Sequence, residues 1–236
     1  MSQITEATRV AQDMAALAKL VAQATRYGQD QAAKAPLGNT MHLKAVTCDR
    51  SQPRHYGANG RRYFSVSSIL NVMHGQEHHG TAEDLARGTE LHRLFAQMLT
   101  TGQGDPGSIY ARWQDRVYDT VYRLRLSSAP VEVERTLVSP VSGMPFAGTV
   151  DVIWQIDGHE LIDLKTGEPE PWHRVQVQAY DWLYQRVTGI RPKRLGLLYA
   201  PHAGDEPPRY VPVRRSTRDW AAFTAALSLL IYRETR

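Results

Sequence analysis

The sequence predicts an α/β fold, because stretches with helical and strand-like spacing of apolar residues follow one another along the chain. Capping patterns mark two helix starts, and an Asp-Gly pair between two apolar runs indicates a β-hairpin. The expected helices span residues 81–99, 108–126, 172–187 and 216–232. The expected strands span residues 131–138, 146–155, 159–165, 193–200 and 209–213, the last at a sheet edge because it contains Pro212.

The length of 236 residues suits one large domain, or one domain with appendages. We expect a domain over residues 61–236, preceded by an N-terminal extension over residues 1–60. Apolar residues at helical spacing predict a helix over 5–26 in this extension. The polar stretch 27–60 predicts a loop, with a short strand from Met41 to Val46.

The composition is that of a soluble globular protein, with 42% hydrophobic and 22% charged residues. The sequence lacks the run of roughly 18 apolar residues that spans a bilayer. Its N-terminus has no signal-peptide core, and Glu6 and Asp13 argue against a transit peptide, so we expect a cytoplasmic protein. Cys48 is the only cysteine, which excludes a four-cysteine iron–sulfur cluster, a cysteine-rich zinc site and a disulfide framework within one chain. The net charge of +4 is compatible with a polyanionic partner but does not require one.

Two acidic residues, Asp151 and Asp163, stand in the predicted hairpin where a half-buried strand favours valine or isoleucine. A two-residue turn at Asp157-Gly158 would point them to opposite faces, because strand side chains alternate. A three-residue turn, Ile156 to Gly158, places Gly158 in the left-handed conformation and sets Asp151 opposite Asp163. In that register Lys165 shares the acidic face. The other face would be core: Val150, Val152, Trp154, Ile156, Ile162 and Leu164.

Two carboxylates on opposed strand positions, about 5 Å apart at the backbone, repel each other unless a cation lies between them. A hard divalent metal with oxygen ligands, such as Mg²⁺, would fit this pair, and Lys165 beside it could orient or deprotonate an attacking water. Removing either carboxylate should then weaken metal binding, and should leave metal-free stability equal or higher. The alternative is an exposed hairpin with an unrelated Asp-Lys pair.

The helix over 81–99 carries a further candidate ligand, His92, at the edge of its apolar stripe. Thr81 can cap this helix, with Asp84 completing a capping-box pattern. Gly88 lies one turn before His92 on the same face, and a mid-helix glycine costs roughly 1 kcal/mol, which suggests a close neighbour there. The alternative for His92 is a packed or solvated side chain.

Two other pairs lie on common faces of their elements. Gln176 and Tyr180 are one turn apart on the helix over 172–187, where a surface hydrogen-bonded pair is the alternative to a functional role. Glu132 and Glu134 share one face of the strand over 131–138 and either face solvent or border the metal site.

The segment from Arg61 to Leu70 turns from a short strand into a helix, for which Ser67 or Ser68 could act as the cap. It is followed by His74, His78 and His79. We interpret these histidines as part of a solvated loop, because no cysteine or carboxylate cluster accompanies them.

The chain thus contains four motifs in order: Gly88-x-x-x-His92, Gly148-Thr-Val-Asp151, Asp163-Leu-Lys165-Thr-Gly167 and Gln176-Val-Gln-Ala-Tyr180. This order resembles the RecB-like branch of the PD-(D/E)XK nuclease superfamily. The segment 65–70, Ser-Val-Ser-Ser-Ile-Leu, also resembles one found in phage exonucleases and in the mitochondrial genome-maintenance exonuclease. The resemblance covers about residues 61 to 200.

This resemblance implies a restriction-endonuclease-like core, a central mixed sheet flanked by helices, with a DNA-cleaving site. His92, Asp151, Asp163 and the backbone carbonyl of Leu164 would hold Mg²⁺ or Mn²⁺. Lys165 would position or activate the water during in-line displacement. Gln176 and Tyr180 would orient the lysine or a substrate phosphate, and these five residues, Asp151, Asp163, Lys165, Gln176 and Tyr180, are the expected catalytic set.

The implied function is a metal-dependent DNA exonuclease of DNA recombination, repair or phage DNA metabolism, encoded by a bacterium or a phage. An endonuclease of the same superfamily, or a catalytically silent nucleic-acid-binding or phage assembly protein, are the alternatives. The sequence departs from many relatives in lacking iron–sulfur cysteines and helicase motifs, since no GxxxxGK[ST] occurs. We therefore expect a stand-alone nuclease or a subunit, with DNA and a single-strand annealing or other recombination protein as candidate partners.

Basic and polar residues supply candidate DNA contacts, although solvated surface charge is the alternative for each one. The candidates are Arg61, Arg62, Ser67, Arg191, Lys193, Arg194, Arg214 and Arg215.

Overall fold

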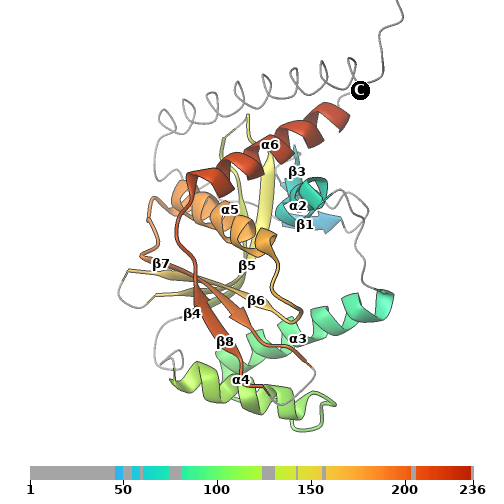
Figure 1. Cartoon of the computed structure of the whole chain (residues 1–236), viewed down its shortest axis with the longest axis vertical. Coiled ribbons are helices and arrows are strands. Elements are labelled where there is room, and N and C mark those ends of the chain that lie inside the picture. The colour runs from blue at the N-terminus through green and yellow to red at the C-terminus, as the bar shows by residue number, and fades with distance from the viewer. Residues whose placement is uncertain are drawn as a thin grey trace, which may run out of the picture.

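An eight-stranded mixed sheet with helices on both faces forms the centre of the computed structural model (Figure 1). The structure describes residues 46–49, 55–58, 61–74, 81–123, 131–141, 143–155, 158–202 and 206–234. The helix predicted over 5–26, the strand predicted from Met41 to Val46 except for its last residue, and His78 and His79 all lie outside these ranges.

The strands are ordered β1-β2-β3-β5-β6-β7-β8, with β4 paired to β5. The β3–β5 and β6–β7 pairs are parallel and the others antiparallel, so the predicted mixed sheet is confirmed. The strands are β1 (Val46–Asp49), β2 (His55–Ala58), β3 (Arg61–Ser65), β4 (Val131–Val138), β5 (Phe146–Trp154), β6 (Glu160–Lys165), β7 (Arg194–Tyr199) and β8 (Arg209–Pro212). Two of these strands, β1 and β2, fall in the stretch that was predicted as loop. That prediction was wrong because β2 is stabilised by pairing with β3, and β1 by pairing with β2, which local composition does not reveal.

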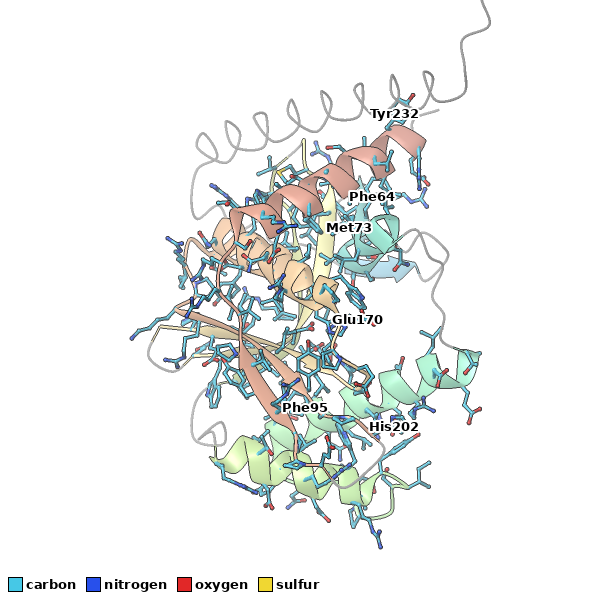
Figure 2. The ribbon with its side chains drawn as sticks, viewed as in Figure 1. Phe64, Met73, Phe95, Glu170, His202 and Tyr232 are labelled. Carbon is cyan, nitrogen blue, oxygen red and sulfur yellow. The ribbon has the colours of Figure 1, made fainter. Side chains whose placement is uncertain are left out.

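Helices pack on both faces of the sheet and cover the two larger of the three core clusters among the described residues (Figure 2). The third cluster is small and lies on β2 to β5, with Tyr56, Tyr63 and Ala147 among its members. Phe64 belongs to the first cluster, between the sheet and helices α2, α5 and α6. Phe95 belongs to the second, between the sheet and helices α3 and α4. The helices are α2 (Val66–His74), α3 (Ala82–Thr101), α4 (Ala111–Arg123), α5 (Pro171–Thr188) and α6 (Thr217–Glu234). None of the helices in the described ranges is long and apolar enough to cross a bilayer.

Because both faces are covered, the predicted division of the hairpin into one core face and one acidic face is wrong. Val150 packs in the first cluster with Ile153, whereas Val152 packs in the second with Ile162. Residues two apart on a regular strand share a face, so the alternation is interrupted around Asp151.

The β5–β6 register is the one predicted for a three-residue turn, with Val152 opposite Ile162 and Trp154 opposite Glu160. Gly158 has a φ of 100°, in the region that favours glycine, as expected for its place in the turn. Continued by one residue, this register would set Asp151 opposite Asp163, as predicted, while the paired residues themselves end at Val152 and Ile162.

The sheet forks along β5. Strand β4 pairs with one edge of β5 over residues 147–154, so β3 and β6 must share the other edge. Strand β3 pairs with Phe146 and Ala147, while β6 pairs with residues 152–154. Asp151 therefore lies on β5 between the part that pairs with β3 and the part that pairs with β6.

The residues that cap the helices α3 and α6 are the predicted ones, and the cap of α2 differs from the prediction. Thr81 and Asp84 form the expected capping box of α3, and Ser216 Oγ accepts a hydrogen bond from the Asp219 backbone N–H at the start of α6. For α2 the cap is Ser65 rather than Ser67 or Ser68, because Ser65 Oγ accepts from the Ser68 backbone N–H at 3.0 Å. The helix begins one turn earlier than its apolar residues indicated, directly after β3.

Close packing at Gly148 joins β5 to α5. A Cβ atom at this position would lie 2.6 Å from the Tyr180 ring and 2.9 Å from a Val66 methyl group. A side chain here would displace Tyr180.

We expect Gly148→Ala to lower the free energy of unfolding by about 1–3 kcal/mol through overpacking. Gly167→Ala is the matched control, since a Cβ atom there meets nothing within 4 Å among the described residues. Urea denaturation of both variants measures the difference. Equal midpoints would contradict the close packing of Tyr180 on Gly148.

Candidate active site

Asp151 is held by contacts from two elements besides its own strand. Its Oδ2 accepts a hydrogen bond of 2.7 Å from the backbone N–H of Leu164 on β6. Its Oδ1 lies 3.1 Å from Nδ1 of His92, which reaches the sheet from α3. The fork in the sheet explains the hydrogen bond from Leu164, because the Asp151 carboxylate takes the place of a main-chain acceptor on β5. The structure thus brings together Asp151, His92 and the backbone of Leu164, although the contact is made by the Leu164 N–H and not by the carbonyl that was predicted as a metal ligand.

Asp163 begins a second chain of polar contacts, toward α5. The Lys165 Nζ atom lies 2.7 Å from Asp163 Oδ2 and donates to Gln176 Oε1, also at 2.7 Å. Gln176 Nε2 donates to Tyr180 OH at 2.8 Å and lies 3.3 Å from Asp163 Oδ1. All four side chains were predicted as catalytic, and the structure places them in one connected group.

Trp172 also contacts this group and was not among the predicted site residues. Lys165 Nζ lies 5.4 Å from the centroid of its indole ring, within the range of a cation–π contact. Trp172 stands at the start of α5, one turn before Gln176. Residues four apart share a helix face, so the spacing from Gln176 would have indicated Trp172.

Glu134 is the acidic residue of β4 that borders the site. Ligand atoms of His92, Glu134 and Asp151 all lie within 4.8 Å of one another. Glu134 has a φ of 51°, a conformation that non-glycine residues rarely adopt. Backbone strain of this kind persists where surrounding structure enforces it, commonly at functional sites. Glu132, by contrast, pairs with Arg135 and Gln155 away from this cluster.

The charges of His92 and Asp151 stabilise each other. Burial lowers the pKa of His92, but the neighbouring Asp151 carboxylate outweighs burial and raises that pKa to about 9. Burial likewise raises the pKa of Asp151, yet the His92 charge and hydrogen bond, with the Lys165 charge and the Leu164 N–H, hold it below its ordinary value. In the metal-free protein at neutral pH the two groups therefore form an ion pair.

For Asp163 and Glu134, the effects that raise the pKa outweigh those that lower it. Burial and the charge of Asp151 raise the pKa of Asp163 to about 6, in spite of Lys165. Burial, followed by the charge of Asp151, raises the pKa of Glu134 to about 7. Burial also raises the pKa of Tyr180 well above its ordinary value, so its hydroxyl keeps its proton. The metal-free site is thus too negative for all its carboxylates to ionise easily.

These residues fit a hard divalent cation. Among the described residues, none makes a well-aligned hydrogen bond to the buried Asp163 Oδ2, although Lys165 Nζ is close to it. Carboxylate oxygens with one imidazole nitrogen are donors that Mg²⁺ and Mn²⁺ accept. A cation here would also remove the repulsion that disfavours ionised Asp163 and Glu134.

The predicted DNA-contact residues are not gathered at this site. Arg194 is paired with Glu160 at the start of β6, five residues or about 16 Å from Lys165 at its end, and Arg191 and Lys193 precede it. Ser67 lies in the first turn of α2, with its Oγ 3.0 Å from Ser65 Oγ.

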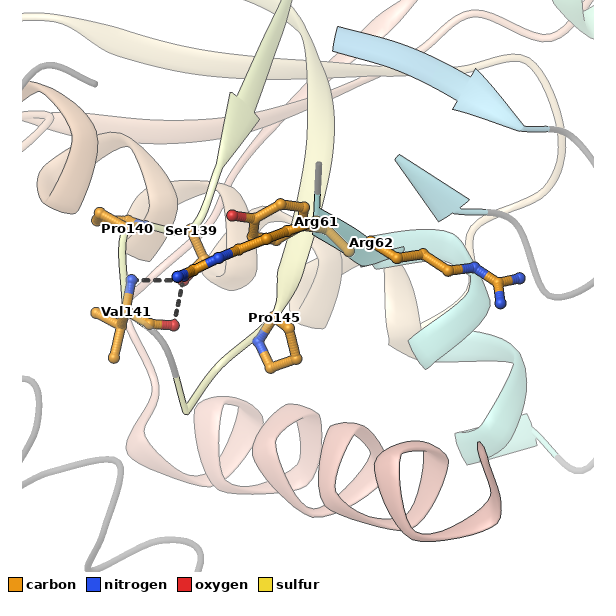
Figure 3. A pocket seen from close by; sticks show the side chains of 7 residues that line it. Arg61, Arg62, Ser139, Pro140, Val141 and Pro145 are labelled. Atoms are coloured by element: carbon orange, nitrogen blue, oxygen red, sulfur yellow. Dashed lines mark hydrogen bonds between the residues drawn. The ribbon is translucent and has the colours of Figure 1, made fainter. Parts of the chain in front are cut away.

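The remaining candidates are equally dispersed. Arg61 and Arg62 leave β3 in opposite directions beside a small pocket that Ser139, Pro140 and Pro145 also line (Figure 3). This pocket, of about 50 Å³, lies at the end of β3 remote from Ser65, which pairs with β5. Arg215 is held in an ion pair with Asp181 on α5, while Arg214 is exposed.

Comparison with families of known proteins gives a match over most of the chain. A family model described as the PD-(D/E)XK nuclease superfamily matches residues 14–234. No curated protein matches the sequence.

Several solved structures also match the chain, all at low sequence identity. One is a putative exonuclease from Eubacterium rectale, with 14% identity, 74% of this chain and 80% of that chain covered, and a TM-score of 0.49. Another is an alkaline exonuclease from Laribacter hongkongensis, with 14% identity, coverage of 72% and 87%, and a TM-score of 0.39. A third is a phage related exonuclease from Haemophilus somnus 129PT, with 13% identity, coverage of 72% and 95%, and a TM-score of 0.34.

The two central carboxylates should differ in their effect on metal-free stability, which the sequence alone did not predict. Asp163→Asn should raise the melting temperature in EDTA at pH 7.5, because burial raises the pKa of Asp163 to about 6 and so disfavours its charge. The gain should disappear near pH 4, where the wild-type group is also neutral. Asp151→Asn should lower the melting temperature at pH 7.5, because the pKa of Asp151 is lowered and its charge is stabilising.

Each effect should be on the order of 1 kcal/mol, which shifts the melting temperature of a domain of this size by about 2–4 °C. Thermal unfolding of both variants at the two pH values is the measurement. Shifts of the same sign at pH 7.5 would contradict the proposed charge states.

Proposed function

Because the chain belongs to the PD-(D/E)XK nuclease superfamily, and has the helix-flanked mixed sheet expected of it, we propose that it is a metal-dependent deoxyribonuclease that degrades linear DNA from its ends. The observation that carries this proposal is the joining of Asp151, Asp163 and Lys165 on one hairpin, with His92 brought to them from α3. The resemblance of Ser65–Leu70 to a segment of phage exonucleases supports end-directed cleavage in particular.

A divalent cation, Mg²⁺ or Mn²⁺, would be held by His92, Asp151, Asp163 and the backbone carbonyl of Leu164, with Glu134 beside them. When bound, it would supply stabilisation of the negative charge that develops on the phosphate. The Leu164 N–H and His92 keep the Asp151 carboxylate ionised and fixed in direction.

Lys165 is the group that acts on the attacking water. Its ammonium is held between Asp163 and Gln176, so it points into the space beside the acid pair. From there the ammonium orients the water or stabilises charge on the phosphate, whereas only the neutral amine, after losing a proton, can receive a proton from the water. Gln176 positions Lys165, and Tyr180 accepts the Gln176 amide hydrogen bond that fixes which way its oxygen faces.

The proposed function places the protein in DNA recombination, DNA repair or phage DNA metabolism. An end-resecting nuclease exposes single strands, so a single-strand annealing protein is the partner that this activity would serve.

Incubation with linear duplex DNA and with covalently closed circular DNA, each in Mg²⁺ and in EDTA, tests the proposal. We expect progressive loss of the linear DNA in Mg²⁺ only, with the circle intact. Cleavage of both forms at similar rates would identify an endonuclease instead. No cleavage of either form in Mg²⁺ or Mn²⁺ would contradict the enzymatic proposal.

Lys165→Ala and Lys165→Arg should each cut at least about a hundredfold more slowly than the wild type, the range of a positioned acid–base group. Arginine retains the charge but is bulkier and cannot act as a base. Single-turnover cleavage of end-labelled linear DNA at saturating Mg²⁺ measures the rate, and DNA binding should remain nearly normal. Arg233→Ala, on the exposed end of α6, is the control for loss of a positive charge. Wild-type rates in Lys165→Ala would show that the lysine has no chemical role.

A further inference from the structure

A pocket next to the active site has no role in the mechanism above. Its volume is about 580 Å³, within the range of pockets that bind small ligands. It begins at Gly167 and Pro169, directly after the end of β6, and extends to Tyr199, Arg209 and Tyr210.

The strand register connects this pocket to the catalytic lysine. Lys165 pairs with Tyr199 on β7, and Tyr199 pairs with Arg209 on the edge strand β8. Directly paired residues on adjacent strands point to the same face, and strands lie about 4.8 Å apart. Lys165, Tyr199 and Arg209 therefore form a row, in which Arg209 stands about 10 Å from Lys165 at the backbone.

Tyr199 forms a fixed platform in this row. Its ring is buried, and its hydroxyl lies 3.1 Å from Nδ1 of His173 at the start of α5. The guanidinium carbon of Arg209 lies 5.5 Å from the ring centroid, so the arginine is stacked on the tyrosine. Stacking reduces the rotamer freedom that Arg209 would lose on binding a ligand.

Arg209 also has an unused charge. It is exposed, and none of the ion pairs formed by the described residues includes it. A planar guanidinium of this kind binds phosphate in a bidentate manner. Candidates such as Arg194 and Arg215, by contrast, already have carboxylate partners.

The rest of the lining suits a nucleotide better than a phosphate ion alone. Pro201, Pro207 and Pro208 supply apolar surface, on which a base can lie. Glu168 and Glu206 also line the pocket, and carboxylates would repel a lone phosphate but can accept hydrogen bonds from base amino groups.

We propose that this pocket is a substrate subsite for the nucleotide adjoining the scissile phosphate, and that Arg209 binds a backbone phosphate of that strand. The proposal rests on the proposed nuclease function. It assigns DNA contact to Arg209, which sequence reasoning did not select, and makes the Lys165–Tyr199–Arg209 row the path of the substrate strand away from the site of cleavage.

Fluorescence anisotropy with an end-labelled linear oligonucleotide in EDTA tests the assignment without cleavage. Arg209→Ala should weaken binding roughly tenfold, the loss expected for one charge-assisted contact. It should also reduce the slope of log affinity against log salt concentration by about 0.7–0.9, the effect of one phosphate contact. Arg209→Lys should retain the slope and lose only part of the affinity, because it keeps the charge but not the stacked planar group.

Arg233→Ala is the matched control, since it removes one exposed positive charge from the far end of α6 and should leave both quantities unchanged. Thermal unfolding establishes that Arg209→Ala is folded. If Arg209→Ala and Arg233→Ala bind with the same affinity and salt slope, the subsite proposal is overturned. Because binding is measured without cleavage, a wild-type protein that fails to cut DNA would contradict the proposed function separately, while the comparison of these variants still decides the role of Arg209.

Discussion

The burial of two carboxylates side by side on the β5–β6 hairpin is the constraint on which the rest of the site depends. Asp151 is 7% exposed and Asp163 2% exposed, so neither charge is stabilised by bulk water. The protein compensates one of them fully, with His92 and a main-chain N–H, and the other only in part. A cation bound beside the two carboxylates would offset the negative potential that remains, which otherwise lowers the stability of the folded protein.

The fork of the sheet makes this arrangement possible. Where β3 and β6 share one edge of β5, the regular ladder of main-chain hydrogen bonds is interrupted, and the Leu164 N–H is satisfied by the Asp151 side chain. The same region contains Gly148, which allows Tyr180 to approach the strand. Helix α5 is thereby held close enough for Gln176 to reach Lys165, so packing on one face of the sheet determines the position of the Lys165 side chain.

The site combines elements with very different requirements. His92 is 59 residues from Asp151 in sequence, and its position depends on how α3 packs against the second core cluster. Glu134 depends on an unusual backbone conformation in β4. The pairing of β5 with β6, in contrast, follows from the local turn between them. A change in the packing of α3 would therefore be expected to displace His92 before it disturbs Asp151 and Asp163.

Local chemistry in the sequence determined the hairpin, its register, the caps of α3 and α6, and the order of motifs that identified the family. These features rest on turn geometry and short-range periodicity, which act within a few residues. Only the tertiary structure decided that both faces of β5 are buried and that β1 and β2 join the sheet. It also decided that Glu134, and not Glu132, borders the site. The row that runs from Lys165 through Tyr199 to Arg209 likewise appears only in the folded chain. The physical reason is that strand order, helix docking and the pairing of surface charges arise from contacts between distant segments, whose free energies no local pattern records.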